Sequence, residues 1–301
     1  MSPERFWLQY STDIYPAETY MTDNLSAAYG NLTPTPFVAG LISFAQRCPR
    51  NWIGKQLALI LRKIVMLTNK QPLDTAVGAI RLRCHLHDNV SERKFLFLPW
   101  LYDPRERELI ARELSGAGVF VDIGANVGIY TLRACQSLTG KGLVIAIEPN
   151  PHVYDRLIFN LQANRALHPD WPQVLTLPIA IGDQEGLLDL HMDRTNLGGS
   201  SLIGHSGSSG TIKVYCKPLT SVLSECRVTR IDILKIDIEG AEDLALLPFL
   251  HSASEQLLPR YLIIENSEYR WQSDLVSAIK QRGYVVSFRT RMNTVYHHAV
   301  I

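Results

Sequence analysis

Beyond residue 118, short apolar runs of β-forming residues alternate along the chain with stretches of helical periodicity. "VFVDI", "LVIAI" and "YLII" are examples of the apolar runs. Such alternation predicts an α/β fold, in which a mostly parallel sheet is covered by helices on both faces. The strands are predicted at 118–123, 143–147, 173–178, 230–236 and 260–265. The helices are predicted near 128–137, 152–165, 241–249 and 271–282.

One segment interrupts this alternation. "GLLDLHM" (186–192) and "TIKVYC" (211–216) predict strands on either side of a loop rich in glycine and serine, residues 194–210. The loop has two interpretations: it closes over an acceptor substrate, or it is simply disordered. The chain finishes with "YVVSFR" and "NTVYHHAV", which predict a last pair of strands.

The chain before residue 118 follows a different pattern. Residues 1–37 carry four prolines among serine, threonine and asparagine, which predicts an extended or poorly ordered segment. Residues 78–100 alternate apolar and polar positions in their first half, as in a half-buried hairpin. Residues 103–116 predict a helix with Asp103 as N-cap and Gly116 at its end.

A basic stretch lies within this first part. Apolar residues recur at helical spacing at Ile53, Leu57, Ile60, Leu61, Ile64 and Leu67. Residues 41–73 contain six Lys or Arg and no acid. In one interpretation the helix packs on a catalytic domain and exposes a basic face; in the other it rests on an anionic membrane or a lipid-linked substrate. We predict an N-terminal extension over residues 1–75, partly disordered and with this one basic amphipathic helix, before a catalytic domain over residues 76–301.

Composition narrows the class of protein. The chain has 301 residues, of which 46% are apolar and 20% charged, as in an ordinary soluble globular enzyme. A net charge of +1 gives no reason to expect a nucleic-acid partner. No apolar run is long enough to predict a transmembrane helix, and the first residues lack the apolar core of a signal peptide. Five scattered cysteines without a C-x-x-C pair fit a reducing compartment, so we expect a cytoplasmic protein.

The segment "VFVDIGANVGIY" predicts a strand, a glycine turn and a helix, which together form a ligand cradle. A dinucleotide fingerprint would require glycines where Asn126 and Ile129 stand. The side chain of Asn126 would crowd a pyrophosphate, whereas a ligand without phosphate needs no such space. S-adenosylmethionine (SAM) is such a ligand. We expect Gly124, Asn126 and Gly128 to form its cradle, and Asp122 to bind its ammonium group or to brace the turn.

Two further strand ends complete the predicted cofactor site. Glu148 follows the strand 143–147, 20 residues beyond Gly128. An acid there either accepts both hydroxyls of a ribose or is a surface carboxylate that caps the next helix. After the third strand, Ala180 and Ile181 are expected to sandwich an adenine ring. Asp183 either accepts a hydrogen bond from the adenine amine or belongs to a plain turn.

The fourth strand, "IDILKIDIEGAE", carries a dense set of ionisable residues. Strand alternation places Lys235 and Asp237 on one face, and a charged Lys235 inside an apolar run needs a partner or an open cleft. Asp237 at the strand end and Glu239 in the turn either form the reaction site or cap the next helix. Glu265 and Asn266 end the fifth strand at the same edge. Asp237, Glu265 and Asn266 either hold Mg²⁺ or form a polar rim without metal.

These motifs resemble the FkbM family of methyltransferases. The resemblance covers roughly residues 80–290 and is carried by "FVDIGANVGIYTL", "AIEPNP", "NLQAN", "AIGDQEG" and "ILKIDIEGAE". It implies the class I methyltransferase (Rossmann-like) fold, a seven-stranded sheet that ends in an antiparallel strand, and methyl transfer from SAM to an oxygen, commonly of a sugar or polyketide. Carried over to this chain, it assigns Asp122, Gly124, Asn126 and Gly128 to the first SAM motif and Glu148 to the ribose. The spacing of Asp237 and Glu265–Asn266 is similar to that of catechol-type O-methyltransferases, which hold a divalent metal.

The preferred function is therefore a SAM-dependent O-methyltransferase that acts on a hydroxyl of a sugar, a glycan or a related secondary metabolite. Asp237 and Glu239 are the candidate catalytic groups, and Lys235 is their electrostatic neighbour. Two alternatives stay open: an NAD(P)-dependent oxidoreductase, and a non-catalytic module that associates with membranes through residues 41–73.

Overall fold

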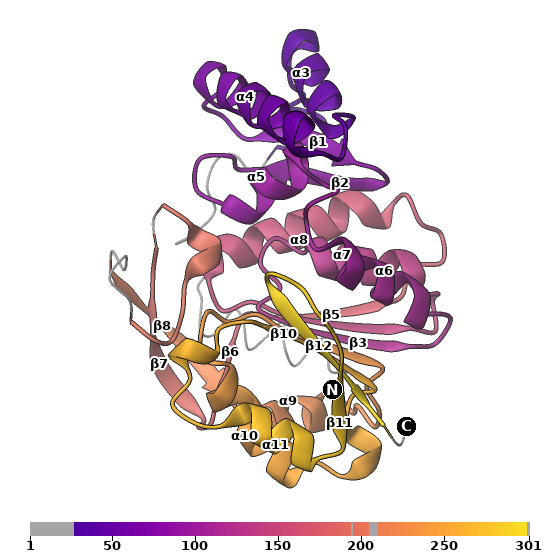
Figure 1. The fold of residues 1–301 in the computed structure, drawn as a ribbon, viewed down its shortest axis with the longest axis vertical. Helices are drawn as coiled ribbons and strands as arrows, with labels where there is room; N and C mark the ends of the chain where they lie inside the picture. The colour runs from indigo at the N-terminus through magenta and orange to yellow at the C-terminus, as the bar shows by residue number, and fades with distance from the viewer. Residues whose placement is uncertain (1–26, 194, 205–209, 300–301) are drawn as a thin grey trace.

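The computed structural model describes residues 27–193, 195–204 and 210–299 (Figure 1). Its centre is a seven-stranded sheet with the order β11-β12-β10-β9-β3-β4-β5. The strands are β3 (Val119–Ile123), β4 (Leu143–Ile147), β5 (Gln173–Leu177), β9 (Ile233–Ile236), β10 (Tyr261–Glu265), β11 (Tyr284–Arg289) and β12 (Asn293–His298). β12 is antiparallel to both β10 and β11, and the other pairs are parallel. The predicted sheet is confirmed, with strand limits within a few residues of those expected.

Helices cover both faces of this sheet, as Figure 1 shows. On one face lie α6 (Pro104–Glu113), α7 (Ile129–Ser137) and α8 (Pro151–Arg165); on the other lie α9 (Leu219–Glu225), α10 (Glu242–Ser252) and α11 (Leu275–Gln281). Strand alternation explains the two layers, because Phe120 packs in one hydrophobic cluster and its neighbour Val121 in the other. Short 3₁₀ turns, η2 (Glu255–Leu257) and η3 (Glu268–Arg270), precede β10 and α11.

The segment that interrupts the alternation forms a second, small sheet with the order β6-β8-β7. It consists of β6 (Ala180–Ile181), β7 (Gly186–His191) and β8 (Thr211–Lys217). The two strands predicted around the Gly/Ser-rich loop are therefore confirmed as β7 and β8. The loop between them includes the 3₁₀ turn η1 (Leu197–Gly199), and its residues 194 and 205–209 lie outside the described part of the chain.

The N-terminal part differs from the prediction in several ways. It contains two helices rather than one, α3 (Pro36–Gln46) and α4 (Trp52–Thr68), then a hairpin of β1 (Leu73–Val77) and β2 (Ile80–Cys84), then α5 (Val90–Phe97). The predicted hairpin 78–100 thus lies earlier in the chain, and the boundary drawn after residue 75 falls inside β1. Of the segment 1–37 that was expected to be extended or poorly ordered, residues 1–26 lie outside the described residues, and its last two residues begin α3. Buried residues of α3 and α4 belong to the same hydrophobic cluster as Phe120 and Val144 of the sheet, so the extension shares its core with the rest of the protein.

The face of α4 that packs inward is also not the predicted one. Of the stripe selected by helical spacing, Leu61 is buried, but Ile53, Ile60 and Leu67 are 69, 58 and 65% exposed. The helix instead buries Gly54, Ala58, Leu61 and Val65. Small residues are needed there because a Cβ at Gly54 would lie 2.0 Å from the carbonyl oxygen of Pro49. Close approach of the α3–α4 turn therefore decides which side of α4 faces inward.

Asp103 is the N-cap residue of α6, as predicted, whereas the helix ends before Gly116. Asp103 precedes α6 with a φ of 41°, but its side chain makes no capping hydrogen bond. It accepts a hydrogen bond from Tyr130 Oη at 3.2 Å and lies 3.5 Å from Lys94 Nζ. The helix ends at Glu113, before Gly116.

Helix α8 holds the hairpin through the asparagines of "NLQAN". Asn160 Oδ1 accepts from the backbone N–H of Arg83, and Asn164 Oδ1 from that of Arg81, both at 2.9 Å. Asn164 also donates to the carbonyl of Arg81 at 2.7 Å. Two side chains one helical turn apart thus supply hydrogen bonds that a neighbouring strand would otherwise supply.

All five cysteines are buried and free. Within the described residues, no helix combines the length and the apolar character that crossing a bilayer requires.

Candidate functional site

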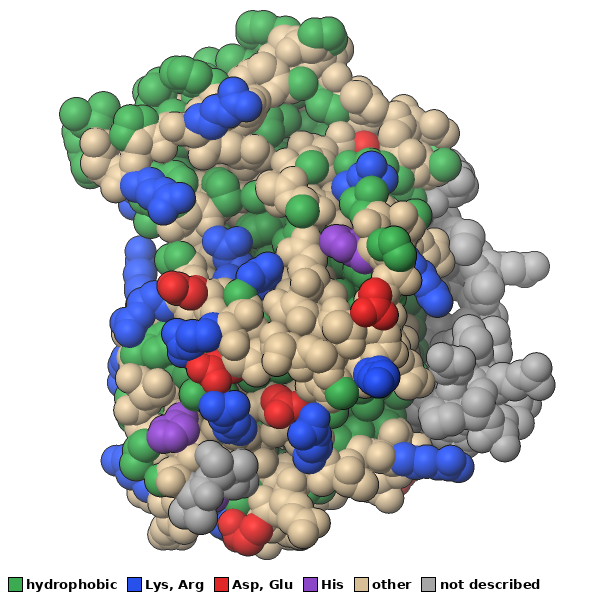
Figure 2. All heavy atoms as spheres, turned by 90° about the vertical axis from the view of Figure 1, so that its right-hand side faces the viewer, with side chains coloured by type: hydrophobic (Ala, Val, Ile, Leu, Met, Phe, Trp, Pro, Cys, Tyr) green, Lys and Arg blue, Asp and Glu red, His purple; other side chains and the backbone are tan. Residues whose placement is uncertain are grey.

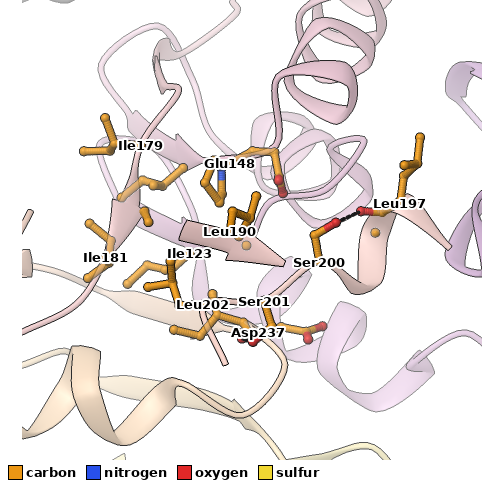
Figure 3. A pocket seen from close by; sticks show the side chains of 16 residues that line it. Ile123, Glu148, Ile179, Ile181, Leu190, Leu197, Ser200, Ser201, Leu202 and Asp237 are labelled. Atoms are coloured by element: carbon orange, nitrogen blue, oxygen red, sulfur yellow. Dashed lines mark hydrogen bonds between the residues drawn. The ribbon is translucent and has the colours of Figure 1, made fainter. Parts of the chain in front are cut away.

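A pocket opens where β3, β4 and β9 end (Figure 3). Its apolar wall includes Ile123, Ile147, Ile179 and Ile181, and its polar groups include the carboxylates of Glu148 and Asp237. Ile179 and Ile181 lie at one end in Figure 3, and Ser200 lies at the other. The pocket therefore lies at the carboxyl edge of the sheet, where open parallel sheets bind ligands.

The turn after β3 requires both of its glycines. Gly124 has a φ of +74°, and a Cβ there would lie 1.9 Å from the carbonyl oxygen of Asp237. Gly128 has a φ of +89° at the start of α7, and a Cβ there would lie 2.6 Å from Leu157 Cδ1. The turns after β3 and β9 consequently touch, which brings the predicted cofactor cradle and the predicted reaction site together.

Asn126 occupies the position of the missing central glycine. It adopts the left-handed conformation, with a φ of 51°, which asparagine tolerates better than most residues. Its Oδ1 accepts from the backbone N–H of Val127 and from Asn89 Nδ2, both at 2.8 Å. A Cβ added at Gly198 would lie 2.2 Å from Asn126 Nδ2, so the Gly/Ser-rich loop packs directly on this side chain. Asn126 thus connects the cradle to α5 and to the loop.

Glu148 lines the pocket with both of its oxygens held by backbone amides. Oε2 accepts from the N–H of Asn126 and Oε1 from that of Asn150, each at 2.9 Å. Burial raises the pKa of Glu148 to about 7, although the two amides oppose the rise. Each carboxylate oxygen has a second lone pair. Glu148 can therefore still accept the two hydroxyls of a ribose. Its place at the end of β4, in the wall of the pocket, is compatible with the predicted role.

The other predicted cofactor residues divide into two groups. Ala180 and Ile181 line the pocket, as expected for an adenine site. Asp183 lies on the exposed turn after β6 and does not line the pocket. Asp122 is fully buried behind the turn, where it accepts from Thr131 Oγ1 at 2.6 Å and lies 3.4 Å from Lys235 Nζ. Of the two roles expected for Asp122, this geometry fits the bracing of the turn.

Residues of the Gly/Ser-rich loop line the pocket, which the sequence analysis did not predict. They are Leu197, Gly198, Ser200, Ser201 and Leu202. Ser201 Oγ lies within hydrogen-bonding distance of two carbonyl oxygens after β9, those of Ile238 and Glu239, at 3.3 and 3.1 Å. The described part of the loop therefore lines the pocket and contacts the turn after β9. The high glycine and serine content of this segment was the feature of the sequence that could have indicated a pocket-lining loop.

Lys235 is the central cation of the site. The sheet register pairs it with Asp122 of β3, and its Nζ lies 3.4 Å from Asp122 Oδ1, 3.7 Å from Asp237 Oδ2 and 5.0 Å from the centre of the Tyr130 ring. Burial lowers its pKa, but the charges of Asp122 and Asp237 outweigh this effect, so its pKa is raised overall. A charged residue inside an apolar strand thus has the partners that the sequence analysis required.

Three acids meet beside Lys235. One carboxylate oxygen from each of Asp237, Glu239 and Glu265 lies within 4.8 Å of the others. Burial, followed by the charge of Asp237, raises the pKa of Glu265 to about 9 and that of Glu239 to about 7. Neighbouring carboxylates that cannot all ionise together share protons, so this cluster can take up and release a proton near neutral pH.

The capping interpretation of these acids does not hold. At the start of α10, Glu242 Oε1 accepts from the N–H groups of Ile238 and Gly240, at 3.0 and 3.2 Å. The second oxygen of Glu242 accepts from Trp271 Nε1 at 2.8 Å. Because Glu242 satisfies this turn, Asp237 and Glu239 are left to face the site.

The predicted magnesium site is not assembled. Asn266 Oδ1 accepts from Thr294 Oγ1 at 2.7 Å, and its Nδ2 donates to the carbonyl of Thr290 at 3.0 Å. Its amide therefore serves the turn between β11 and β12, and Glu239 takes the place expected for Asn266 beside Asp237 and Glu265. The trio of Asp237, Glu265 and Asn266 is therefore not brought together, whereas Asp237, Glu239 and Glu265 offer three oxygens close enough to hold a metal ion. No metal enters the function proposed below.

The strand order and the pocket define a class I methyltransferase. Counted along the chain, the strands of the main sheet are ordered 6-7-5-4-1-2-3 with the seventh antiparallel, and the pocket lies at the carboxyl ends of the first, second and fourth. The chain belongs to the FkbM methyltransferase family, because the model described as "Methyltransferase FkbM domain" matches residues 122–286.

Comparison with single proteins gives more distant likenesses. A curated relative, methyltransferase sdnD of Sordaria araneosa, is 29% identical over a match covering 40% of this chain and 56% of that one, just over half of its length. A methyltransferase FkbM from Methylobacillus flagellatus is 14% identical with a TM-score of 0.42, over 86% of this chain and 58% of that one. M. jannaschii TYW2, solved with AdoMet, is 13% identical with a TM-score of 0.37, over 76% and 84%. These scores are low, and the fold assignment depends on strand order and register alone.

Proposed function

We propose that this protein is a SAM-dependent methyltransferase that transfers a methyl group to a hydroxyl oxygen of a sugar, a glycan or a related secondary metabolite. The observation that carries the proposal is the contact between two sites. Glu148 lies in the pocket after β4, and the acids Asp237, Glu239 and Glu265 meet at the neighbouring strand ends. The touching turns of Gly124 and Asp237 join the two.

The cofactor half of the proposal assigns a task to each group in the pocket. Glu148 would hold the ribose hydroxyls, Ala180 and Ile181 the adenine, and the turn at Gly124 the remainder of the molecule. Bound SAM supplies a methyl group on a positively charged sulfur, which is already electrophilic. The protein must then mainly align an acceptor and exclude water, and such positioning supplies about 7–11 kcal/mol.

The acceptor half concerns the proton of a hydroxyl group. An alcohol is a poor nucleophile, and a positioned base contributes about 10²–10⁴-fold. Glu239, with a pKa of about 7, is matched to this task because a general base works best with a pKa near the working pH. Asp237 is the second candidate, and Lys235 balances its charge from 3.7 Å. Arg270 holds Glu239 in place by donating to its carbonyl at 2.8 Å.

The oxidoreductase alternative finds no support. The chain belongs to a methyltransferase family. Asn126, which packs against Gly198, also occupies the position where a dinucleotide fingerprint has the glycine that a pyrophosphate approaches.

Calorimetry and a transfer assay test this function together. We expect heat on titration with SAM and none with NADH or NADPH, and transfer of labelled methyl from SAM into hydroxyl-bearing glycan or small-molecule fractions. Glu148→Gln should weaken SAM binding, whereas Glu239→Gln should keep binding and lose transfer. Glu108→Gln, an exposed acid on α6, is the matched control and should behave as the parent protein.

Three results speak against the proposal. Absence of SAM binding removes the cofactor assignment. Label found only on nitrogen or carbon removes the O-methyl assignment. Transfer that stops with EDTA and returns with added Mg²⁺ shows that the metal-free account of the acid cluster is wrong.

A further inference from the structure

Exposed apolar side chains concentrate on one surface of the protein. Fourteen large hydrophobic residues are exposed among those the structure describes, and half of them belong to two helices, α3 and α4, of 11 and 17 residues. We call this surface the α3–α4 face. It consists of Phe37, Phe44, Trp52, Ile53, Ile60, Ile64 and Leu67, with exposed fractions from 36 to 72%. Green side chains gather at the same end of the molecule in Figure 2.

Helix α4 is apolar on two sides, and only one of them is covered. Ala58, Leu61 and Val65 are buried in the core, whereas Ile53, Ile60, Ile64 and Leu67 form a separate stripe at intervals of seven, four and three residues. A helix that is apolar almost all round is normally covered on more than one side. A large exposed apolar patch with a polar rim is typical of an interaction site.

The charged residues of the chain segment that carries this face have a single sign. The chain contains no Asp or Glu between Asp23 and Asp74. The six basic residues of this stretch are Arg47, Arg50, Lys55, Arg62, Lys63 and Lys70, and none forms an ion pair within the described residues.

We propose that the α3–α4 face docks on an anionic lipid surface. Phe37, Phe44 and Trp52 would lie at the boundary between headgroups and acyl chains, where aromatic side chains are favoured. The basic residues would contact the anionic headgroups. Since no described helix is long and apolar enough to cross a bilayer, the contact is peripheral. The proposal concerns a surface away from the methyl-transfer site and does not depend on the acceptor.

Charge complementarity favours a lipid surface over a second copy of the chain. A twofold interface brings the same patch of two subunits together. Such an interface would bring the basic residues of this stretch in one copy toward those of the other, with no acid in the stretch to balance them. An anionic lipid surface offers acyl chains to the apolar stripe and negatively charged headgroups to the basic residues.

Vesicle co-sedimentation of the full-length protein tests this. We expect the protein to sediment with phosphatidylcholine vesicles that contain phosphatidylglycerol, to stay in solution with phosphatidylcholine alone, and to be released by added salt. Trp52→Ser combined with Ile60→Ser should lower the partition coefficient about tenfold or more. Lys63→Glu combined with Lys70→Glu should lower it to a similar extent. All four side chains are exposed, so the fold should survive, and thermal unfolding verifies this.

The matched control is Val285→Ser combined with Val286→Ser, which removes two apolar side chains that are 50 and 52% exposed on β11. This variant should bind vesicles as the parent protein does. The proposal is overturned if the parent protein ignores anionic vesicles or binds neutral ones equally well. A stable dimer in light scattering that the Trp52/Ile60 variant abolishes also overturns it, because the face is then an interface between copies.

Discussion

Gly124 has no Cβ, and every other residue at this position would place a carbon atom there. The φ of +74° and the contact of 1.9 Å that a Cβ would make with the carbonyl of Asp237 both require glycine. We expect Gly124→Ala to lower the free energy of unfolding by more than about 1 kcal/mol, and to separate the two halves of the site.

Urea denaturation measures this effect, and Gly40→Ala provides a matched control. Gly40 lies inside α3 with no atom near its would-be Cβ, so alanine there should stabilise the protein by about 0.5–1 kcal/mol. Equal effects of the two substitutions would contradict the account of the Gly124 turn.

Glu148 gives a second prediction at the scale of a residue, one that assumes the proposed function. Its pKa of about 7 means that it is partly protonated at neutral pH, and a ribose needs the carboxylate as acceptor. SAM affinity should therefore rise between pH 6 and 8 and level off above. Calorimetry at several pH values measures this, and Glu148→Gln should remove the dependence. A parent protein whose affinity is flat over that range would count against the role of Glu148.

At the scale of elements, the structure depends on side chains that replace missing backbone partners. Asn160 is fully buried, accepts from the N–H of Arg83 and donates to the carbonyl of Val127 at 3.0 Å. Asn160 thus connects the β1–β2 hairpin, α8 and the glycine turn after β3. The Gly/Ser-rich loop is also bound to the segment after the hairpin, because the N–H of Leu197 donates to the carbonyl of Asp88 at 2.8 Å.

Asn160→Ala should lower the free energy of unfolding by about 1–3 kcal/mol, because it leaves buried backbone groups without partners. Hydrogen exchange of the Arg83 amide should become faster in the same variant. Gln162→Ala, on the exposed side of the same helix, should change neither quantity. If both variants behave alike, the asparagine does not hold the hairpin.

At the scale of the whole molecule, buried acids set the response to alkaline pH. Burial raises the pKa of Glu92 to about 8, of Glu265 to about 9, and of Glu148 and Glu239 to about 7. Above pH 6.5 the folded protein holds protons that an unfolded glutamate, with a pKa near 4.5, has released. Raising the pH therefore favours unfolding, and stability should fall from pH 6.5 to 9.

Thermal unfolding across this range measures the slope. The substitution Glu265→Gln removes the group with the highest of these pKa values. The melting temperature of this variant should therefore fall less steeply with pH than that of the parent protein. Glu108→Gln should leave the profile unchanged. A parent protein whose melting temperature rises from pH 7 to 9 would show that the acid cluster does not hold the protons inferred here.

Local sequence patterns were sufficient for the parallel sheet and for placing several candidate site residues at its carboxyl edge. Alternation of apolar runs with helical stretches determines which residues enter strands, because buried strands need continuous apolar side chains. Lys235 inside such a run indicated a buried partner from its charge alone, and Glu148 followed from its distance to the glycine turn.

Only the tertiary structure decided which neighbours those residues have. Helical spacing selected Ile53, Ile60 and Leu67 as the packed stripe of α4, but the close approach of Pro49 to Gly54 turned the small residues inward. Asn266 does not join Asp237 and Glu265, because its amide accepts from Thr294 on the neighbouring strand β12, and Glu239 lies beside those two acids instead. Spacing along a chain constrains which side of an element a residue occupies, whereas contacts between distant segments depend on packing that no single segment encodes.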